Sequence, residues 1–292
     1  MSDFLRASLW MSGAIVSFSV MAVAGREASA ELDTFEIMTY RSLIGLLIVI
    51  GLIALKRQFH TITRADLGLH GMRNLAHFAG QNLWFYALTL MPLAQLFALE
   101  FTTPIWVLLL SPFLLGRPIR AVGLLAALIG FVGILIIAQP GVGGLGPGIL
   151  PAAACAICFA LTVIFTKRLT ARHSTYAILF YLTLMQSGFG LIATGYDLQI
   201  TLPSLAILPL VVLIGLAGVT AHFCMTTALS LAPASVVSPI DFVRLPVIAL
   251  VGALLYAEPL QLSVLFGAVL IFAGNYLNII TESKNNAKLT LR

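Results

Sequence analysis

Four charged residues interrupt long apolar runs of the sequence: Arg41, Glu100, Asp241 and Arg244. A charge inside a membrane-spanning segment is costly, so such residues mark functional sites by default. Asp241 and Arg244 are three positions apart, which puts them on one face of a helix and lets them neutralise each other. A carboxyl group buried in apolar surroundings can exchange a proton near neutral pH or pair with an ammonium group. Either Arg41 or Arg244 can bind a carboxylate.

Two interpretations of these charges stay open. In the first, Glu100, Asp241 and Arg244 line a central cavity; in the second, they form a static ion pair that orients helices. Neighbouring apolar runs also carry polar and aromatic residues. These form either a wet pocket with an aromatic wall for a flat solute, or hydrogen bonds between helices and anchors at the membrane interface. The candidates of this kind are Tyr40, His77, Gln81, Asn82, Phe101 and His222.

Motifs of enzymes and metal sites are absent from the sequence. Its five histidines lack metal-ligand spacing, and no HExxH or phosphate-loop pattern occurs. The Cys155–Cys158 pair lies within an apolar run, where packing of small residues explains it. We therefore expect no catalytic activity, no cofactor and no metal.

Composition places most of the chain in lipid. Of its 292 residues, 60% are hydrophobic and only 9% are charged, whereas soluble proteins carry about 25% charged residues. The basic residues are scattered among short loops, which argues against nucleic acid as a partner. Runs long enough to span a bilayer predict an all-α membrane protein with ten helices. The predicted spans are 7–25, 36–55, 71–90, 93–115, 119–138, 148–166, 176–195, 206–228, 234–256 and 260–280.

The distribution of basic residues predicts the orientation. Thirteen of the 16 Lys and Arg residues fall in the termini and the even-numbered connections, while only Arg26 falls on the opposite side. Cytoplasmic segments are enriched in Lys and Arg. We therefore expect a multi-pass protein of a bacterial-type inner membrane with both termini in the cytoplasm.

An internal repeat divides the chain. Residues 87–92 recur at 228–233, and the same 141-residue offset relates Glu100 to Asp241 and Gln81 to His222. Five spans per repeat is an odd number, so the two halves must insert with opposite orientation. The predicted parts are a first repeat (1–140), a linker (141–147), a second repeat (148–282) and a cytoplasmic tail (283–292).

Small residues on the fifth and tenth spans predict close helix packing, either within the chain or at a homodimer face. They are Ala126, Gly133, Gly267 and Gly274.

The motifs at the helix ends resemble those of the drug/metabolite transporter superfamily, EamA type. The A-L-x-L-x-P pattern precedes spans four and nine, Phe113–Gly116 ends span four, and Tyr256–Pro259 precedes the last span. The family often has Glu after the Leu-Gly element, and this chain has Arg117 there, while Glu258 keeps the acid in the second half. The resemblance implies secondary transport of amino acids, amines, vitamins or similar metabolites.

These observations predict a secondary transporter that works by alternating access on a small molecule, with or without a co-transported proton. Among the solutes known for the superfamily that the chain resembles, the aromatic residues of spans three and four make riboflavin uptake the sharpest candidate. Export of amino acids or amines is the alternative, because paired acids and arginines suit a zwitterion. A membrane scaffold or sensor without turnover is the competing class.

Overall fold

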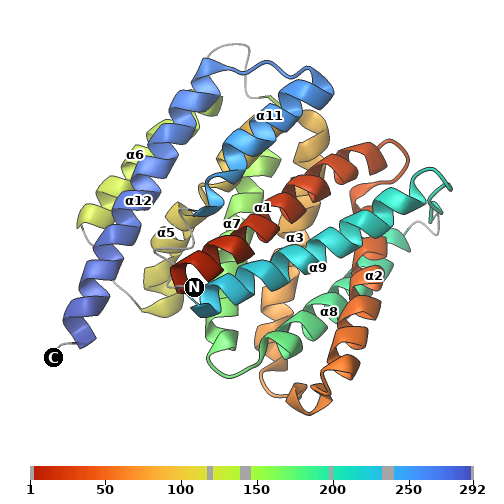
Figure 1. Ribbon diagram of the computed structural model, residues 1–292. Helices are drawn as coiled ribbons and strands as arrows, with labels where there is room; N and C mark the ends of the chain where they lie inside the picture. The colour runs from red at the N-terminus through yellow and green to blue at the C-terminus, as the bar shows by residue number, and fades with distance from the viewer. Residues whose placement is uncertain (1–2, 117–120, 139–145, 197–199, 232–239, 291–292) are drawn as a thin grey trace.

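The apolar runs of the sequence form helices, and together these make an all-α membrane protein (Figure 1). The computed structural model describes residues 3–116, 121–138, 146–196, 200–231 and 240–290, and no β-strand occurs within those ranges. The helices are α1 (Asp3–Ala28), α2 (Thr34–Leu55), the short 3-10 helix η1 (Phe59–Thr61), α3 (Leu67–Leu90), α4 (Leu93–Glu100), α5 (Thr103–Leu115), α6 (Ala121–Ala138), α7 (Ile149–Thr170), α8 (Thr175–Thr194), α9 (Leu208–Leu231), α11 (Arg244–Tyr256) and α12 (Leu262–Thr290).

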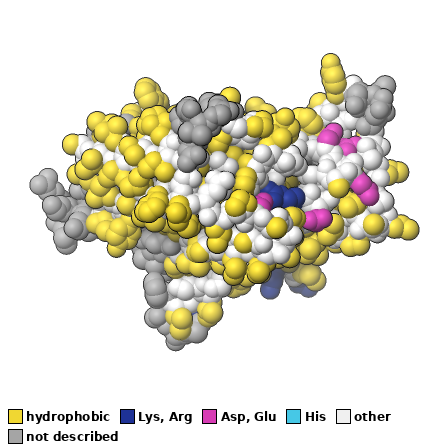
Figure 2. All heavy atoms as spheres, turned by 90° about the horizontal axis from the view of Figure 1, so that it is seen from above, with side chains coloured by type: hydrophobic (Ala, Val, Ile, Leu, Met, Phe, Trp, Pro, Cys, Tyr) yellow, Lys and Arg dark blue, Asp and Glu magenta, His cyan; other side chains and the backbone are white. Residues whose placement is uncertain are grey.

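The outer surface of the bundle is apolar. Leu55 is 81% exposed and Phe113 is 84% exposed, as expected for side chains that face lipid, and hydrophobic side chains cover much of the surface in Figure 2. Six helical segments among the described residues are long and apolar enough to cross a membrane: Leu5–Ala28, Thr34–Leu55, Leu93–Leu110, Ile149–Thr170, Thr175–Thr194 and Leu208–Ala228. The 24-residue α3 is more polar, yet at 1.5 Å per residue it is about 36 Å long, enough to span the bilayer.

Helix contacts come in pairs related by the 141-residue offset. α1 packs on α9, and their repeat equivalents α7 and α3 pack on each other. In the same way, α2 packs on α9 and α8 packs on α3. Two further large contacts, α2 with α8 and α6 with α12, join equivalent helices directly. This pattern is that of a pseudo-two-fold axis between the halves.

Hydrogen bonds between connections show that the halves are inverted. At one end of the bundle, the α1–α2 connection meets the α8–α9 connection, where Glu31 accepts a hydrogen bond from the Ser204 hydroxyl (2.8 Å). At the other end, the α2–α3 connection meets the α7–α8 connection, where Asp66 pairs with His173 (3.1 Å). The hydrogen bond from His173, together with the charge of Arg172, holds the pKa of Asp66 below its ordinary value. Equivalent connections therefore lie at opposite ends, as the odd number of spans per repeat requires.

Two predicted spans are broken, which corrects the prediction of continuous helices. The segment 93–115 forms α4 and α5, separated by Phe101 and Thr102. The equivalent residues of the second half, Phe242 and Val243, form a turn between helical residues 240–241 and α11. Residues 234–239 of that predicted span lie outside the described part. The predicted cytoplasmic tail begins within α12, which continues to Thr290.

The first break follows from local chemistry. Pro104 has no N–H, so the Glu100 carbonyl loses its helical partner there. The Thr103 hydroxyl donates to that carbonyl instead (2.7 Å), and the Thr102 hydroxyl donates to Leu99 O (2.7 Å). Pro246 lies just after the second break and likewise lacks the donor. At the first break, the threonine hydroxyls thus bond carbonyl groups that would find no partner in lipid.

α6 and α12 approach each other at glycines. A Cβ on Gly133 would lie 2.6 Å from the Gly267 carbonyl oxygen, and one on Gly274 would lie 2.6 Å from the Ala126 oxygen. All four small residues predicted for close packing therefore face each other within the chain. Of the two alternatives, packing inside one protein is the one that the structure has.

We expect Gly133→Ala to lower the thermal unfolding midpoint in detergent, because its methyl group overlaps backbone that cannot move aside. A cost of about 1–3 kcal/mol is typical of such overpacking. Gly188→Ala is the matched control, since no atom lies within 4 Å of a Cβ there. Equal midpoints for the two variants would contradict tight α6–α12 packing.

Candidate functional site

One arginine joins the two helix breaks. Arg244 is the first residue of α11, and Glu100 is the last of α4. The Nη2 atom of Arg244 donates to Glu100 Oε1 at 2.9 Å and to Asp241 Oδ2 at 3.1 Å. The predicted approach of Glu100 and Asp241 across the repeat is thus present, with Arg244 between them. We call these three residues the ion cluster.

Aromatic rings enclose the ion cluster. The guanidinium carbon of Arg244 lies 4.8 Å from the centre of the Phe18 ring, 5.1 Å from that of Phe97 and 5.0 Å from that of Phe101. Such contacts stabilise a cation away from water. The predicted residue Phe101 therefore belongs to the site. It also stands edge-on to Phe242 and Phe272, whose rings stack at 4.4 Å.

The ion cluster is not fully satisfied. The Trp84 indole donates to Glu100 Oε2 at 2.8 Å, so both oxygens of that carboxylate have partners. Asp241 Oδ1 and Arg244 Nε are buried, and neither has a hydrogen-bond partner among the described residues. Two carboxylates and one guanidinium leave a net charge of −1. The cluster can therefore accept a further donor or cation at Asp241.

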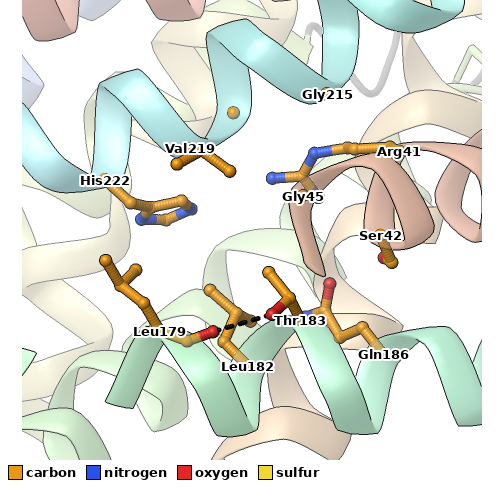
Figure 3. Close-up of a pocket in the computed structure, with 11 residues that line it drawn as sticks. Arg41, Ser42, Gly45, Leu179, Leu182, Thr183, Gln186, Gly215, Val219 and His222 are labelled. Carbon is orange, nitrogen blue, oxygen red and sulfur yellow. Dashed lines mark hydrogen bonds between the residues drawn. The ribbon is translucent and has the colours of Figure 1, made fainter. Parts of the chain in front are cut away.

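A small cavity lies between α2, α8 and α9 (Figure 3). Its volume for water-sized groups is about 20 Å³. Arg41 projects into it from α2, opposite His222 of α9, with Thr183 and Gln186 of α8 along one wall. We call it the Arg41 cavity.

Several residues that line the Arg41 cavity are equivalent to one another in the two repeats. Three pairs of its lining residues are 141 positions apart: Arg41 with Leu182, Ser42 with Thr183, and Gly45 with Gln186. The cavity is therefore at the interface of equivalent helices, where inverted-repeat transporters hold their substrates. Its charge is not symmetric, because only one half supplies an arginine.

Ring contacts connect the cavity with the ion cluster. The His222 ring is 5.8 Å from the Phe18 ring, which in turn contacts Arg244. His77 lies 5.3 Å from His222, ring centre to ring centre. Both ring nitrogens of His77 and Nε2 of His222 are buried without hydrogen-bond partners in the described structure. The two predicted histidines thus contact each other, and His222 connects the lining of the Arg41 cavity with Phe18 beside the ion cluster.

The remaining predicted residues differ in their positions. Gln81 is buried and its Oε1 has no partner within the described residues. Asn82 is buried too, but its amide donates to Phe78 O of the same helix (2.8 Å), which accounts for half of its polar groups. Tyr40 lies apart from both sites, since its hydroxyl donates to Thr201 O (2.7 Å) at the end of the bundle. It is not among the residues that line the Arg41 cavity, and a role for it in a substrate cavity stays a prediction.

Three site residues escaped sequence analysis. Arg73 counts as a loop charge in the sequence, yet it is buried and donates to Thr166 Oγ1 (3.1 Å). Trp84 reads as an interfacial anchor, yet it is 2% exposed and bonded to Glu100. Gln186 is 1% exposed. The sequence could have indicated Gln186 through the repeat, because the equivalent residue in the first half is Gly45, which has no side chain.

A second polar cluster closes one end of the bundle. Arg26, at the end of α1, forms an ion pair with Glu258 and donates to the carbonyls of Leu88 (2.7 Å) and Met91 (2.6 Å). Glu258 in turn accepts from the Leu93 amide (2.8 Å). The pair therefore ties α1, α3, α4 and the α11–α12 connection together. Seen from above, a small basic area adjoins acidic side chains (Figure 2).

Comparison with known families gives one match that covers both halves. The profile described as the EamA-like transporter family matches residues 5–139 and again residues 146–280. The S-adenosylmethionine uptake transporter of Rickettsia felis is 26% identical over 289 residues, which is 97% of each chain. The riboflavin transporter of Brucella anthropi is 31% identical over 216 residues, 72% of this chain and 76% of the relative. The riboflavin transporter of Vibrio cholerae is 25% identical over 86% of this chain and 85% of its own.

A solved crystal structure has the same fold. It superposes with a TM-score of 0.65, covers 95% of this chain and 98% of its own, and shares 22% identity. At that identity the likeness concerns the fold alone.

We expect Arg244→Met to destabilise the protein strongly, because it leaves two carboxylates without their cation. Removing one partner of a buried ion pair costs about 3–5 kcal/mol. The neutral triple variant with Glu100→Gln and Asp241→Asn should regain most of the loss, as measured by thermal unfolding in detergent. Arg172→Met is the control, since its side chain is 75% exposed. A single variant as stable as that control would contradict an ion cluster that holds the repeats together.

Proposed function

Because the chain belongs to the EamA-like transporter family, we propose that it is a secondary transporter that carries a small organic metabolite by alternating access. The observation that carries this proposal is the ion cluster at two equivalent helix breaks, where the repeats meet. In inverted-repeat transporters, broken helices near the membrane centre hold the substrate and the coupling ion. Residues that join the halves in one state are the ones that change partners in another.

S-adenosylmethionine is the first candidate substrate. The relative with that substrate in its name matches nearly the whole chain. The molecule carries a carboxylate, an ammonium group and a sulfonium cation. The net negative ion cluster with its aromatic rings suits the cations, and Arg41 suits the carboxylate.

Riboflavin is the second candidate. It is supported by the relative from Brucella anthropi, which has a higher identity over a shorter stretch, and by the stacked Phe242 and Phe272 rings, which offer a flat surface beside the ion cluster. Export of amino acids or amines stays a prediction from the sequence, and none of the relatives reported above carries such a name.

The orientation of the chain in the membrane and the energy source of transport are part of the same proposal. We place the chain in an inner membrane with both termini in the cytoplasm, as the distribution of basic residues favours. A proton can drive uptake if it displaces Arg244 from one of the two carboxylates. A scaffold or sensor would lack turnover, so saturable flux separates these classes.

Flux into proteoliposomes tests the proposal. Labelled S-adenosylmethionine and labelled riboflavin are offered separately, with and without an imposed pH gradient, and saturable entry of one is expected. Glu100→Gln should lower that entry at least about tenfold, which corresponds to ~1.4 kcal/mol of lost stabilisation. Glu31→Gln is the matched control, an exposed carboxylate that is bonded to Ser204.

The outcomes of the flux assay are distinct. Entry of neither compound, nor of amino acids or amines in the same vesicles, would contradict transport. Full activity of Glu100→Gln at matched expression would contradict the role of the ion cluster.

The pair Arg26–Glu258 closes one end of the bundle in this state, so its loss should favour opening there. Glu258→Gln leaves Arg26 without its partner, and labelling of Cys155 by a membrane-impermeant thiol reagent should rise about tenfold, equivalent to ~1.4 kcal/mol in the closing equilibrium. Cys155 is buried on α7, which packs against α4 and α5, and Cys158 and Cys224 are replaced by Ala in this assay. The same labelling rate in Glu258→Gln and the Glu31→Gln control would argue against a gate at this end.

A further inference from the structure

Arg41 is a buried cation without a counter-ion. Its exposed fraction is 6%, and its Nε has no hydrogen-bond partner among the described residues. Among the described residues, the one hydrogen-bond acceptor of its side chain is the Met38 sulfur, 3.5 Å from Nη1, which is a weak acceptor. No carboxylate of the described structure lies within 4.0 Å of it. A guanidinium in this position destabilises the empty protein, so packing alone does not account for it.

The charge around Arg41 has one sign. Arg73 is also buried, and the two are close enough for their charges to interact. Its hydrogen bonds go to neutral groups, Thr166 Oγ1 (3.1 Å) and Asn74 Oδ1 (2.8 Å). This region therefore carries positive charge, whereas the ion cluster carries −1. The interior presents opposite charges at two connected places.

The surroundings of Arg41 leave room for one oxygen atom of an anion. α9 passes the guanidinium at Gly218, where a Cβ would lie 2.7 Å from Arg41 Nε. The Gln186 amide nitrogen is a second buried donor without a partner, and its side chain lies across the cavity from Arg41 (Figure 3). A space of about 20 Å³ holds one water-sized group, such as one oxygen of a carboxylate. The rest of a metabolite needs the helices to separate, as alternating access requires.

We infer that Arg41, with Gln186, binds a carboxylate of the transported molecule. The cationic part of the same molecule then points past His222 and Phe18 toward Asp241, whose Oδ1 has no partner in the described structure. The substrate is therefore a zwitterion derived from an amino acid, and riboflavin, which has no carboxylate, does not fit. Arg244 cannot take this role, because Glu100 and Asp241 already neutralise it. This inference rests on the proposed function and assigns the substrate class to it.

A stability measurement separates binding from a structural role. Arg41→Met removes an unpaired buried charge while keeping an unbranched side chain as far as the level of Nε, so the ligand-free thermal midpoint should rise. A structural residue would give the opposite sign. Gly51→Ala is a control on the same helix, since nothing lies within 4 Å of its Cβ.

Ligand-induced stabilisation then tests the carboxylate directly. Purified protein is titrated with S-adenosylmethionine and with its decarboxylated analogue, which differ only in that group. Wild type should bind the first at least about 30-fold more tightly, the lower range for a buried charged hydrogen bond. Arg41→Gln should bind both alike, and Gly218→Ala should weaken the preference by displacing the guanidinium. Arg172→Gln, at an exposed arginine, should behave as wild type.

Each outcome of the binding and flux measurements either supports or overturns the inference. A carboxylate preference that survives Arg41→Gln, equal binding of the two compounds by wild type, or binding of neither overturns the inference. Saturable riboflavin flux that Arg41→Gln does not change also overturns it, while the transporter function stands. Carboxylate-dependent binding without any flux supports the Arg41 site and rejects the proposed transport.

Discussion

Arg244 holds one carboxylate from each half of the molecule, and the arrangement of the interior depends on that shared charge. Glu100 and Asp241 would repel each other across the pseudo-two-fold axis if the guanidinium did not lie between them. Both carboxylates come at helix breaks, where free backbone groups already need polar partners. The breaks therefore bring polar groups to one place, and the aromatic rings around Arg244 keep that place closed. A cluster of this kind is stable in one packing and has to exchange partners before the halves can move.

The scaffold is symmetric, but its charges are not, and this asymmetry distinguishes the two ends. By the repeat offset, Arg26 corresponds to Lys167 and Glu258 corresponds to Arg117. Arg117 lies outside the described residues, so the comparison concerns residue types alone. Each pair takes one residue from each half: Arg26 and Glu258 have opposite charges, whereas the equivalent residues Lys167 and Arg117 are both basic. The same holds in the centre, where Arg41 corresponds to Leu182. The helices of the two halves are thus equivalent, while their charged side chains are not.

The sequence predicted the features that follow from its apolar runs and from its internal repeat. Helix positions, the 141-residue repeat and the meeting of Glu100 with Asp241 were all within reach, because burial and duplication leave regular signals. The break at Phe101 was missed, since its cause is Pro104 combined with two threonine hydroxyls, in a run that remains apolar throughout. Arg73 and Trp84 were misplaced because a residue near a span end can face lipid headgroups or the interior. Tyr40 shows the same ambiguity, because its hydroxyl donates to Thr201 O in the connection before α9.

Buried charges in this protein have two different physical roles. In the ion cluster, desolvation is offset by close partners, so the charges support the fold of the state described here. At Arg41 the offset is missing, and its cost is met by the stability of the surrounding helices. A fold keeps an uncompensated guanidinium in an apolar bundle only where something outside the chain completes it. When an anion enters, the unfavourable charge becomes a binding contribution, and the same residue that destabilises the empty protein lowers the free energy of the loaded one. The difference between these states is what a secondary transporter couples to movement.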